Sequence, residues 1–384
     1  MLDNFNLVQS LKKQQTQHGY RYLTTIERGV TPTITIEGQA YRNFASNDYL
    51  GLASAPQVIA AFGDALQTAG QVGSGASHLV SGHHQWHDEL SAALAQATGY
   101  PAALTFSTGY MANVAVLQAL CSKDSVIFSD KLNHASIVDG AVLSRATLVR
   151  FGHRDYDALE QRLAITLAPQ KLIVTDHVFS MDGTMADLAR LYDLAQRYEA
   201  ALMVDDAHGF GLLYQAAALA DIYVGTLGKA IGTMGAFVAG ESALIDYLVN
   251  FARAFIYTTA MPPALAKATL AAVHLAQRDS ARQQRLQARI FQLSTGLREQ
   301  GWQVGLASDT PTSWQTAIVP VIVGDNTRAL QLADHLRQAG IWATPMRPPT
   351  VPVGTARLRF CVSAAHSADD ITALLDTMAR LRGV

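Results

Sequence analysis

The feature that most constrains the fold is a regular alternation, from about residue 102 onward, of short apolar runs with amphipathic stretches. The apolar runs predict strands at residues 102–106, 125–129, 147–151, 172–175, 201–205, 222–226 and 235–239. Amphipathic stretches at 113–120, 156–167 and 187–198 predict helices between them. Strands that alternate with helices in this way favour an α/β fold with a mainly parallel, seven-stranded sheet.

The remaining chain predicts smaller parts on either side of this sheet. With 384 residues, the chain exceeds the size at which one core usually stops growing. We expect an N-terminal helix and hairpin segment over 1–50, the hairpin turning at Glu37-Gly38-Gln39. A large domain over 51–262 follows, and a bridging helix from Pro263 to about residue 300 opens a small α+β domain over 263–384. That domain takes its predicted elements from 316–323, 328–338, 356–363 and 369–381.

Composition excludes several classes of protein. The chain is 49% hydrophobic and 16% charged with a net charge of −2, which is typical of a globular protein without a nucleic-acid partner. Its two cysteines, Cys121 and Cys361, lie far apart, so neither a disulfide framework nor a zinc finger is expected. No apolar run approaches the roughly 20 residues that cross a bilayer. We therefore expect a cytoplasmic protein without a membrane partner.

Two polar clusters follow predicted strands and carry the chemistry. They are Met203-Val-Asp-Asp-Ala-His-Gly209 and Val224-Gly-Thr-Leu-Gly-Lys229. In open α/β sheets the carboxyl ends of the strands are where ligands bind. Lys229 and Asp205 at that edge suit pyridoxal phosphate, because the lysine can form a Schiff base while the aspartate keeps the pyridine nitrogen protonated. Taken singly, the aspartates could close a turn and the lysine could be solvated; together they favour the cofactor.

Other segments offer contacts for such a cofactor, each with a structural alternative. Gly109 and Tyr110 begin a predicted helix after a strand, and free N–H groups at a helix start bind phosphate. Ser107 or Thr108 could equally be an ordinary helix cap there.

His134 could stack on the cofactor ring or simply cap a helix. Ser180 could bind the phenolic oxygen or close its turn.

Three apparent ligand motifs are discounted. The segment Gly73-Ser-Gly-Ala-Ser-His78 lacks the third glycine of a dinucleotide fingerprint, and Gly225-Thr-Leu-Gly-Lys229 is too short for a phosphate-binding P-loop. His83 and His87 stand four apart on a predicted helix, but no glutamate follows His83 and the sequence shows no third ligand. No metal site is expected.

The chain resembles the α-oxoamine synthases, which are fold-type I pyridoxal-phosphate enzymes, over nearly its whole length. The segments that carry the resemblance are Asn43-Phe-Ala-Ser-Asn-Asp-Tyr-Leu-Gly51, Gly73-Ser-Gly-Ala-Ser-His-Leu-Val-Ser-Gly82, Val178-Phe-Ser-Met-Asp-Gly183, Val204-Asp-Asp-Ala-His-Gly209, Gly225-Thr-Leu-Gly-Lys229, Tyr257-Thr-Thr-Ala-Met-Pro-Pro263 and Arg347-Pro-Pro-Thr-Val-Pro-Val-Gly-Thr-Ala-Arg-Leu-Arg359. The Arg-Pro-Pro-Thr-Val-Pro stretch is most similar to the member of the family that acts in biotin biosynthesis. One segment departs from the pattern: residues 212–220 are shorter and more apolar than is usual for the family.

The resemblance implies a role for each matched residue. The implied catalytic residues are Lys229, which carries the cofactor as a Schiff base, His134, Asp205 and His208. The implied cofactor contacts are Gly109, Tyr110, His134, Ser180, Asp205, His208, Thr226 and Lys229, with Thr258 or Thr259 from the second subunit of a homodimer. The implied substrate contacts are Arg21, Asn47, His134, Thr350 and Arg359, the last pairing with the amino-acid carboxylate.

The implied reaction is a decarboxylative condensation of L-alanine with a pimeloyl thioester, carried on coenzyme A or a carrier protein. The alternatives within the family are glycine C-acetyltransferase, 5-aminolevulinate synthase and serine palmitoyltransferase. A catalytically silent pyridoxal-binding regulatory protein is an alternative of another class. The joint presence of Lys229, Asp205, His208 and Arg359 argues against it, because a scaffold needs no electron sink beside a carboxylate clamp.

Overall fold

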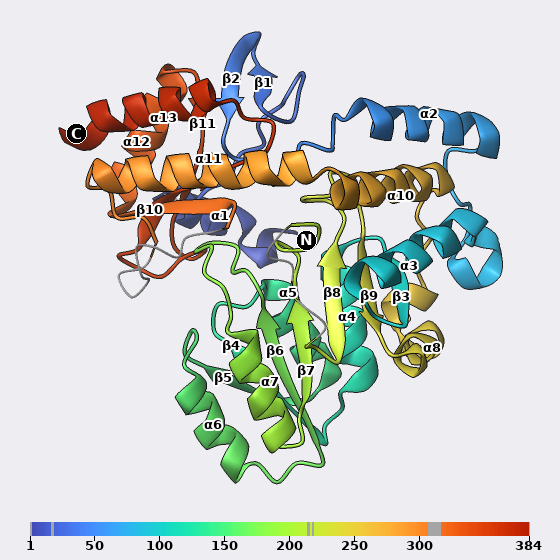
Figure 1. Ribbon diagram of the computed structural model, residues 1–384. Coiled ribbons are helices and arrows are strands. Elements are labelled where there is room, and N and C mark those ends of the chain that lie inside the picture. Colours follow the sequence, from blue (N-terminus) through green and yellow to red (C-terminus); the bar gives the residue numbers. More distant parts are fainter. Residues whose placement is uncertain (1, 17–18, 213–215, 217–218, 306–315, 384) are drawn as a thin grey trace. The chain divides into compact units, whose positions relative to one another are not determined.

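A computed structural model of the chain describes residues 2–16, 19–212, 216, 219–305 and 316–383 (Figure 1). The chain divides into two compact units. We call Met1–Ser46 with Ala288–Val384 the terminal unit, and Asn47–Gln287 the central unit. This division into units does not test the predicted domain boundaries at residues 50 and 262, which stay a prediction.

The central unit contains the predicted seven-stranded sheet, in the order β3-β9-β8-β7-β6-β4-β5 (Figure 1). β9 pairs antiparallel with both β3 and β8, and the other neighbouring strands pair parallel. The predicted fold class is therefore confirmed. The strands are β3 (Ala102–Phe106), β4 (Ser125–Asp130), β5 (Thr147–Phe151), β6 (Gln170–Asp176), β7 (Ala201–Asp205), β8 (Ile222–Thr226) and β9 (Ala236–Gly240).

The central strands of this sheet are largely apolar because helices cover both of its faces. Figure 1 shows α6 (Tyr156–Ile165) and α7 (Leu188–Arg197) in front of the sheet, and α4 (Gly109–Leu120) and α5 (Ala135–Ser144) behind it. In α7 the residues Leu188, Leu191, Leu194 and Ala195 are buried, which is the spacing of one helical face. Burial of this apolar stripe fixes the helix on the sheet.

Further helices of the central unit include several that the sequence did not delimit. They are α2 (Pro56–Ala69), α3 (Gln85–Thr98), α8 (Ser242–Phe251), α9 (Arg253–Ile256) and α10 (Pro263–Arg278), with a π-helical turn η2 (His78–Gly82). The predicted single bridging helix is wrong, because a break at Asp279 separates α10 from α11 (Ser280–Glu299). The Asp279 carboxylate accepts from the backbone N–H of Arg282 at 2.8 Å, so it caps the start of the second helix. Among the described residues no helix is both long and apolar enough to cross a bilayer.

The terminal unit joins the two ends of the chain through a small sheet of order β1-β2-β11. Here β1 (Thr33–Ile36) and β2 (Gln39–Asn43) form the predicted hairpin, and Glu37 and Gly38 take the positive φ values of 51° and 74° that a two-residue turn requires. β11 (Ile341–Trp342) pairs parallel with β2. The second sheet consists of β10 (Ile318–Gly324), β13 (Ala356–Cys361) and β12 (Thr344–Met346); the helices are α1 (Leu7–Thr16), α12 (Asn326–Gln338) and α13 (Ala368–Arg380).

Candidate active site

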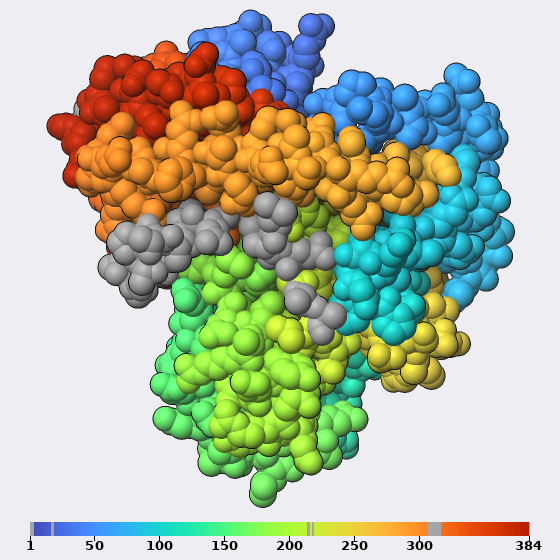
Figure 2. Space-filling view, in the orientation of Figure 1, coloured from blue at the N-terminus to red at the C-terminus, as the bar shows by residue number. Residues whose placement is uncertain are grey.

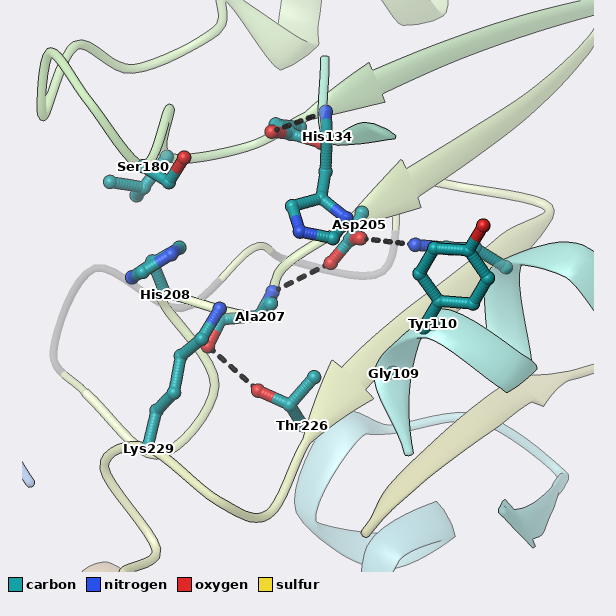
Figure 3. Close-up of a pocket in the computed structure, with 12 residues that line it drawn as sticks. Gly109, Tyr110, His134, Ser180, Asp205, Ala207, His208, Thr226 and Lys229 are labelled. Carbon is teal, nitrogen blue, oxygen red and sulfur yellow. Dashed lines mark hydrogen bonds between the residues drawn. The ribbon is translucent and has the colours of Figure 1, made fainter. Parts of the chain in front are cut away.

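A pocket of about 180 Å³ opens at the carboxyl ends of the central strands of the seven-stranded sheet. Its walls come from the ends of β6, β7 and β8, from the first turn of α4 and from the loops that follow the strands. The lining residues are Gly109, Tyr110, Asn113, His134, Asp176, Val178, Ser180, Asp205, Ala207, His208, Thr226 and Lys229. In Figure 3 the side chains of His134 and Lys229 reach toward one central space from opposite sides.

Asp205 is the last residue of β7 and is held by two donors. Its Oδ2 accepts from Asn113 Nδ2 at 2.6 Å, and its Oδ1 accepts from the backbone N–H of Ala207 at 3.0 Å (Figure 3). The residue is only 5% exposed. A buried carboxylate fixed in this way is a ready partner for a cationic N–H group on a ligand.

Asp176 lies beside Asp205, because β6 and β7 pair in parallel with these two residues in register. Burial raises the pKa of the Asp176 carboxyl well above its usual value, and the charge of Asp205 raises it further. The backbone N–H of His134, which donates to Asp176 at 3.2 Å, partly offsets both effects. The pocket thus contains two neighbouring acids, of which Asp176 retains its proton to a higher pH than an ordinary aspartate.

His134 caps α5, which confirms the capping interpretation, and it also lines the pocket; its stacking on the cofactor ring stays a prediction. Its Nδ1 lies 2.7 Å from Ser136 Oγ. Ser136 Oγ in turn accepts from Asn113 Nδ2 at 2.9 Å. A continuous chain of hydrogen bonds therefore connects Asp205, through Asn113 and Ser136, to the ring of His134.

The start of α4 offers an anion site at the other end of the pocket. Thr108 caps the helix by accepting from the backbone N–H of Met111 at 3.2 Å, which confirms the capping interpretation of this residue. A Cβ on Gly109 would lie 2.7 Å from Cγ2 of Thr226, so the approach of these two residues requires a glycine. N–H groups at the start of a helix favour a phosphate group there.

His208 and Ser180 form a further wall of the pocket. His208 Nδ1 lies 2.7 Å from the hydroxyl of Tyr49, which donates to Asn47 Oδ1 at 3.2 Å. Ser180 lies in a tight turn that is closed by a hydrogen bond from the N–H of Gly183 to the carbonyl of Phe179. Figure 3 places Ser180 and His208 on the side of the pocket away from Tyr110.

The residues fit pyridoxal phosphate by the chemistry of their donors and acceptors. An amine, a fixed carboxylate, a flat imidazole and a helix start surround one small space. Asn113 Oδ1 is also buried in the pocket wall without a hydrogen-bond partner in the described part of the chain, so one acceptor there is available to a ligand.

The structure gathers eight of the predicted site residues in this pocket. They are Gly109, Tyr110, His134, Ser180, Asp205, His208, Thr226 and Lys229. Asn47 reaches the pocket indirectly, through Tyr49 and His208.

Thr258 and Thr259 lie after α9, where Thr259 forms an isolated bridge with Ser77. Arg21, Thr350 and Arg359 belong to the terminal unit. The roles predicted for all of these residues stay predictions.

Sequence reasoning missed Asn113, Asp176, Val178 and Ala207 in the pocket. A signal existed for two of them. Asp176 ends an apolar strand as Asp205 does, but the predicted strand stopped at residue 175. Asn113 follows Gly109 by one helical turn and therefore shares its face of α4. The unusual segment 212–220 lies largely outside the described residues, although the N–H of Ala216 donates to Asp206 at 2.8 Å.

Comparisons with known proteins agree with this geometry. A family model described as aminotransferase class I and II matches residues 40–378. Relatives described as 8-amino-7-oxononanoate synthase, from Aromatoleum aromaticum and Methylobacillus flagellatus, are 50% and 48% identical; each match covers 91% of this chain, and 91% and 88% of the relatives. The chain belongs to the 8-amino-7-oxononanoate synthase family.

A solved structure supports the fold and the cofactor together. Serine palmitoyltransferase from S. paucimobilis, with a bound adduct of pyridoxal phosphate and myriocin, has a TM-score of 0.92 and 28% identity, over 99% of this chain and 98% of that chain. The predicted family, the fold-type I architecture and the dependence on pyridoxal phosphate are thus confirmed.

Proposed function

We propose that the chain condenses L-alanine with a pimeloyl thioester, with loss of carbon dioxide, to give 8-amino-7-oxononanoate and a free thiol. The observation that carries this proposal is the convergence of Lys229 and Asp205 on one pocket of about 180 Å³ in a member of this family. Such a product is an intermediate on the route to biotin.

Each wall of the pocket has a part in holding the cofactor. Lys229 would hold its aldehyde carbon, Asp205 would pair with the pyridine nitrogen, and the ring of His134 would stack on its face. The start of α4 at Gly109 and Tyr110, with Thr226, receives the phosphate, and Ser180 and His208 face the phenolic oxygen. When bound, the cofactor supplies an electron sink for the pair left on the α-carbon of the amino acid.

The side chains of the pocket then control protons. Nζ of Lys229, which lines the pocket, would remove the α-proton of alanine and later return a proton to the product. Asp205 stays in place because Asn113 and the N–H of Ala207 both donate to it. The raised pKa of Asp176 limits the negative charge beside Asp205, so the two acids need not both be charged in one small volume.

The substrates and the second subunit complete the proposal. Asn47 and Arg359 hold the amino-acid end, with Arg359 on the carboxylate, and Arg21 and Thr350 meet the acyl chain. In a homodimer, Thr258 or Thr259 of one subunit reaches the cofactor phosphate in the pocket of the other subunit. This arrangement is supported by the family to which the chain belongs.

A matrix of substrates tests the proposal. Alanine, glycine and serine are each assayed with pimeloyl, acetyl, succinyl and palmitoyl thioesters, and the pimeloyl group is offered on coenzyme A and on carrier protein. We expect alanine with a pimeloyl thioester to give the highest kcat/KM. Serine with palmitoyl thioester is included because of the structural likeness to serine palmitoyltransferase. Preference for that pair, or for glycine with acetyl-CoA, would overturn the assignment.

A spectral titration separates catalysis from silent binding. The visible absorption band of the bound cofactor should shift on addition of alanine and change again on addition of the pimeloyl thioester. A band that no amino acid alters would instead favour a regulatory protein that binds the cofactor without using it.

A further inference from the structure

Three histidines that are spread over ten residues of sequence gather outside the pocket. His78 begins the π-helical turn η2, His83 follows that turn, and His87 lies in the first turn of α3. Their ring centroids are 4.8, 5.0 and 5.4 Å apart in pairs. One ring nitrogen from each lies within 4.8 Å of the other two. The prediction that His83 and His87 share one helix is wrong, since α3 begins at Gln85, and the structure adds His78 as a third member.

In two of the three histidines, Nε2 contacts an oxygen acceptor that fixes the orientation of the ring. His83 Nε2 lies 2.8 Å from Asp88 Oδ1, and His87 Nε2 lies 2.8 Å from the carbonyl oxygen of Met261. When these Nε2 atoms donate, each ring has its lone pair on Nδ1. Metal-binding histidines almost always donate their second nitrogen to a carboxylate or a backbone carbonyl in this way.

Two of the rings are also fixed by packing. His87 is fully buried, and His78 stacks on Phe255 with centroids 4.9 Å apart and an interplanar angle of 14°. These two rings are therefore held close together before an ion binds.

We propose that His78, His83 and His87 bind a divalent transition-metal ion of the class that prefers imidazole, most readily Zn²⁺, with a water molecule in the remaining position. Imidazole nitrogen suits Zn²⁺, Ni²⁺ and Cu²⁺, whereas Mg²⁺ and Ca²⁺ require several oxygen ligands. The His83 side chain is 40% exposed, which gives the ion a path from solvent. The light-blue segment near residues 70–85 lies at the surface in the space-filling view (Figure 2).

Binding requires a local rearrangement that is itself measurable. His78 Nδ1 and His83 Nδ1 lie 2.7 Å apart and share a proton between them. Ligand nitrogens about 2.0–2.1 Å from a tetrahedral ion stand farther apart than this, so the contact opens and the proton between the rings moves to Nε2 of His78. His87 Nδ1 gives up the hydrogen bond that it accepts from the N–H of His84 at 2.9 Å. Uptake of the ion should therefore change the tautomer of His78, which the NMR signals of its ring nitrogens report.

The site has a structural role, because its ligands connect segments that lie far apart in sequence. His87 Nε2 and Ser74 Oγ both contact the carbonyl oxygen of Met261, at 2.8 and 2.6 Å. The N–H of Ala260 donates to the carbonyl of Ala76 at 3.0 Å. An ion on the three rings would clamp the loop before α3 to the segment that ends at Met261.

The test measures metal content and affinity on the untagged holoenzyme. We expect one Zn²⁺ per chain after dialysis, and a Co²⁺ derivative with the visible absorption of a low-coordinate site. His83→Gln should weaken Zn²⁺ binding by more than about 100-fold, and Asp88→Asn by roughly 10-fold, because loss of an orienting partner costs 10–100-fold. Mg²⁺ should not compete.

His335→Gln is the matched control, since His335 lies on the exposed face of α12 and should leave Zn²⁺ binding unchanged. The proposal is overturned if wild type retains no Zn²⁺, or if the variant His83→Gln binds it as tightly as wild type. If His83→Gln does not fold, Asp88→Asn decides the question through the same affinity. None of these measurements depends on turnover, so they are independent of the proposed reaction.

Discussion

The pocket and the histidine cluster are both sets of polar side chains in the central unit, yet they are built differently. The pocket takes Asp176, Asp205 and Thr226 from the ends of neighbouring strands. The cluster takes His78, His83 and His87 from a π-helical turn, a connecting residue and a helix start. A sheet brings strand ends together by rule, whereas nothing in the sequence says that a loop will fold onto the helix that follows it. The first kind of site can be read from sequence, and the second requires coordinates.

The comparison also predicts that the two sites affect different properties. Changes in the pocket should alter turnover, and changes in the cluster should alter stability and metal binding. The following variants test that separation.

The largest effect is expected from Lys229→Ala. No other group in the proposed reaction can bind the cofactor covalently, so we expect no measurable turnover and loss of the visible band of the bound cofactor. The assay is formation of 8-amino-7-oxononanoate together with the absorption spectrum. Lys267→Ala is the matched control, because Lys267 is a half-exposed lysine that pairs with Glu89 and should retain wild-type turnover. An active Lys229→Ala variant would show that the pocket does not carry turnover.

Asp205→Asn should have the next largest effect on turnover. The amide keeps the size of the side chain and can still accept from the N–H of Ala207, but it has no negative charge to offer the pyridine nitrogen. We expect kcat to fall by at least about 100-fold, as is usual when one fixed electrostatic contact to the reacting system is lost. Steady-state kinetics and circular dichroism, run in parallel, would distinguish this from misfolding. A fall of less than threefold would show that Asp205 has no such contact.

His87→Ala should alter stability instead. The change removes one of two contacts to the carbonyl of Met261, leaves the N–H of His84 without its acceptor on His87, and opens a space under α3. We expect a loss of about 2–4 kcal/mol in the free energy of unfolding, measured by urea titration. The folded fraction should keep its kcat. A variant that unfolds normally but turns over slowly would break the proposed separation of the two sites.

Asp176→Asn should have the smallest effect, visible in the pH dependence of stability. The raised pKa of Asp176 means that, above the pKa of about 3.9 in the unfolded chain, the folded protein binds more protons at this group than the unfolded one. Wild-type stability should therefore fall as pH rises from about 4 towards the folded-state pKa, with a slope of at most about 1.4 kcal/mol per pH unit. The asparagine variant should lack this slope. Urea titrations of the cofactor-free proteins between pH 4 and 8 measure it, and parallel curves for the two proteins would contradict the raised pKa.

The strands of the large sheet could be predicted closely because their local signal and their environment agree. Residues 102–106, 147–151, 201–205 and 222–226 were predicted with the bounds that the structure gives. Three of these strands, β3, β7 and β8, are almost wholly buried, and a continuous apolar run is what that environment selects. The edge strand β5 is more exposed. The break at Asp279 was missed because both sides of it have helical composition, and only the contact between its carboxylate and Arg282 shows where one helix ends.

The pocket was predictable in part for the same reason. Lys229, Asp205 and Thr226 follow apolar runs whose ends must meet at one edge of the sheet. Asp176 follows the same pattern, and a strand prediction longer by one residue would have included it. The link from Asn47 to His208 passes through Tyr49, which is 159 positions away from His208 in the sequence. No local sequence pattern encodes a contact at that separation.

The amide of Asn113 donates both to Asp205 and to Ser136, and Ser136 contacts His134. One small side chain on α4 therefore connects the Asp205 carboxylate to Ser136 and, through it, to the ring of His134. A leucine has the same number of side-chain heavy atoms but would donate neither to Asp205 Oδ2 nor to Ser136 Oγ. Substitutes tolerated at position 113 should accordingly be limited to side chains that carry an N–H group, however well an apolar one fits.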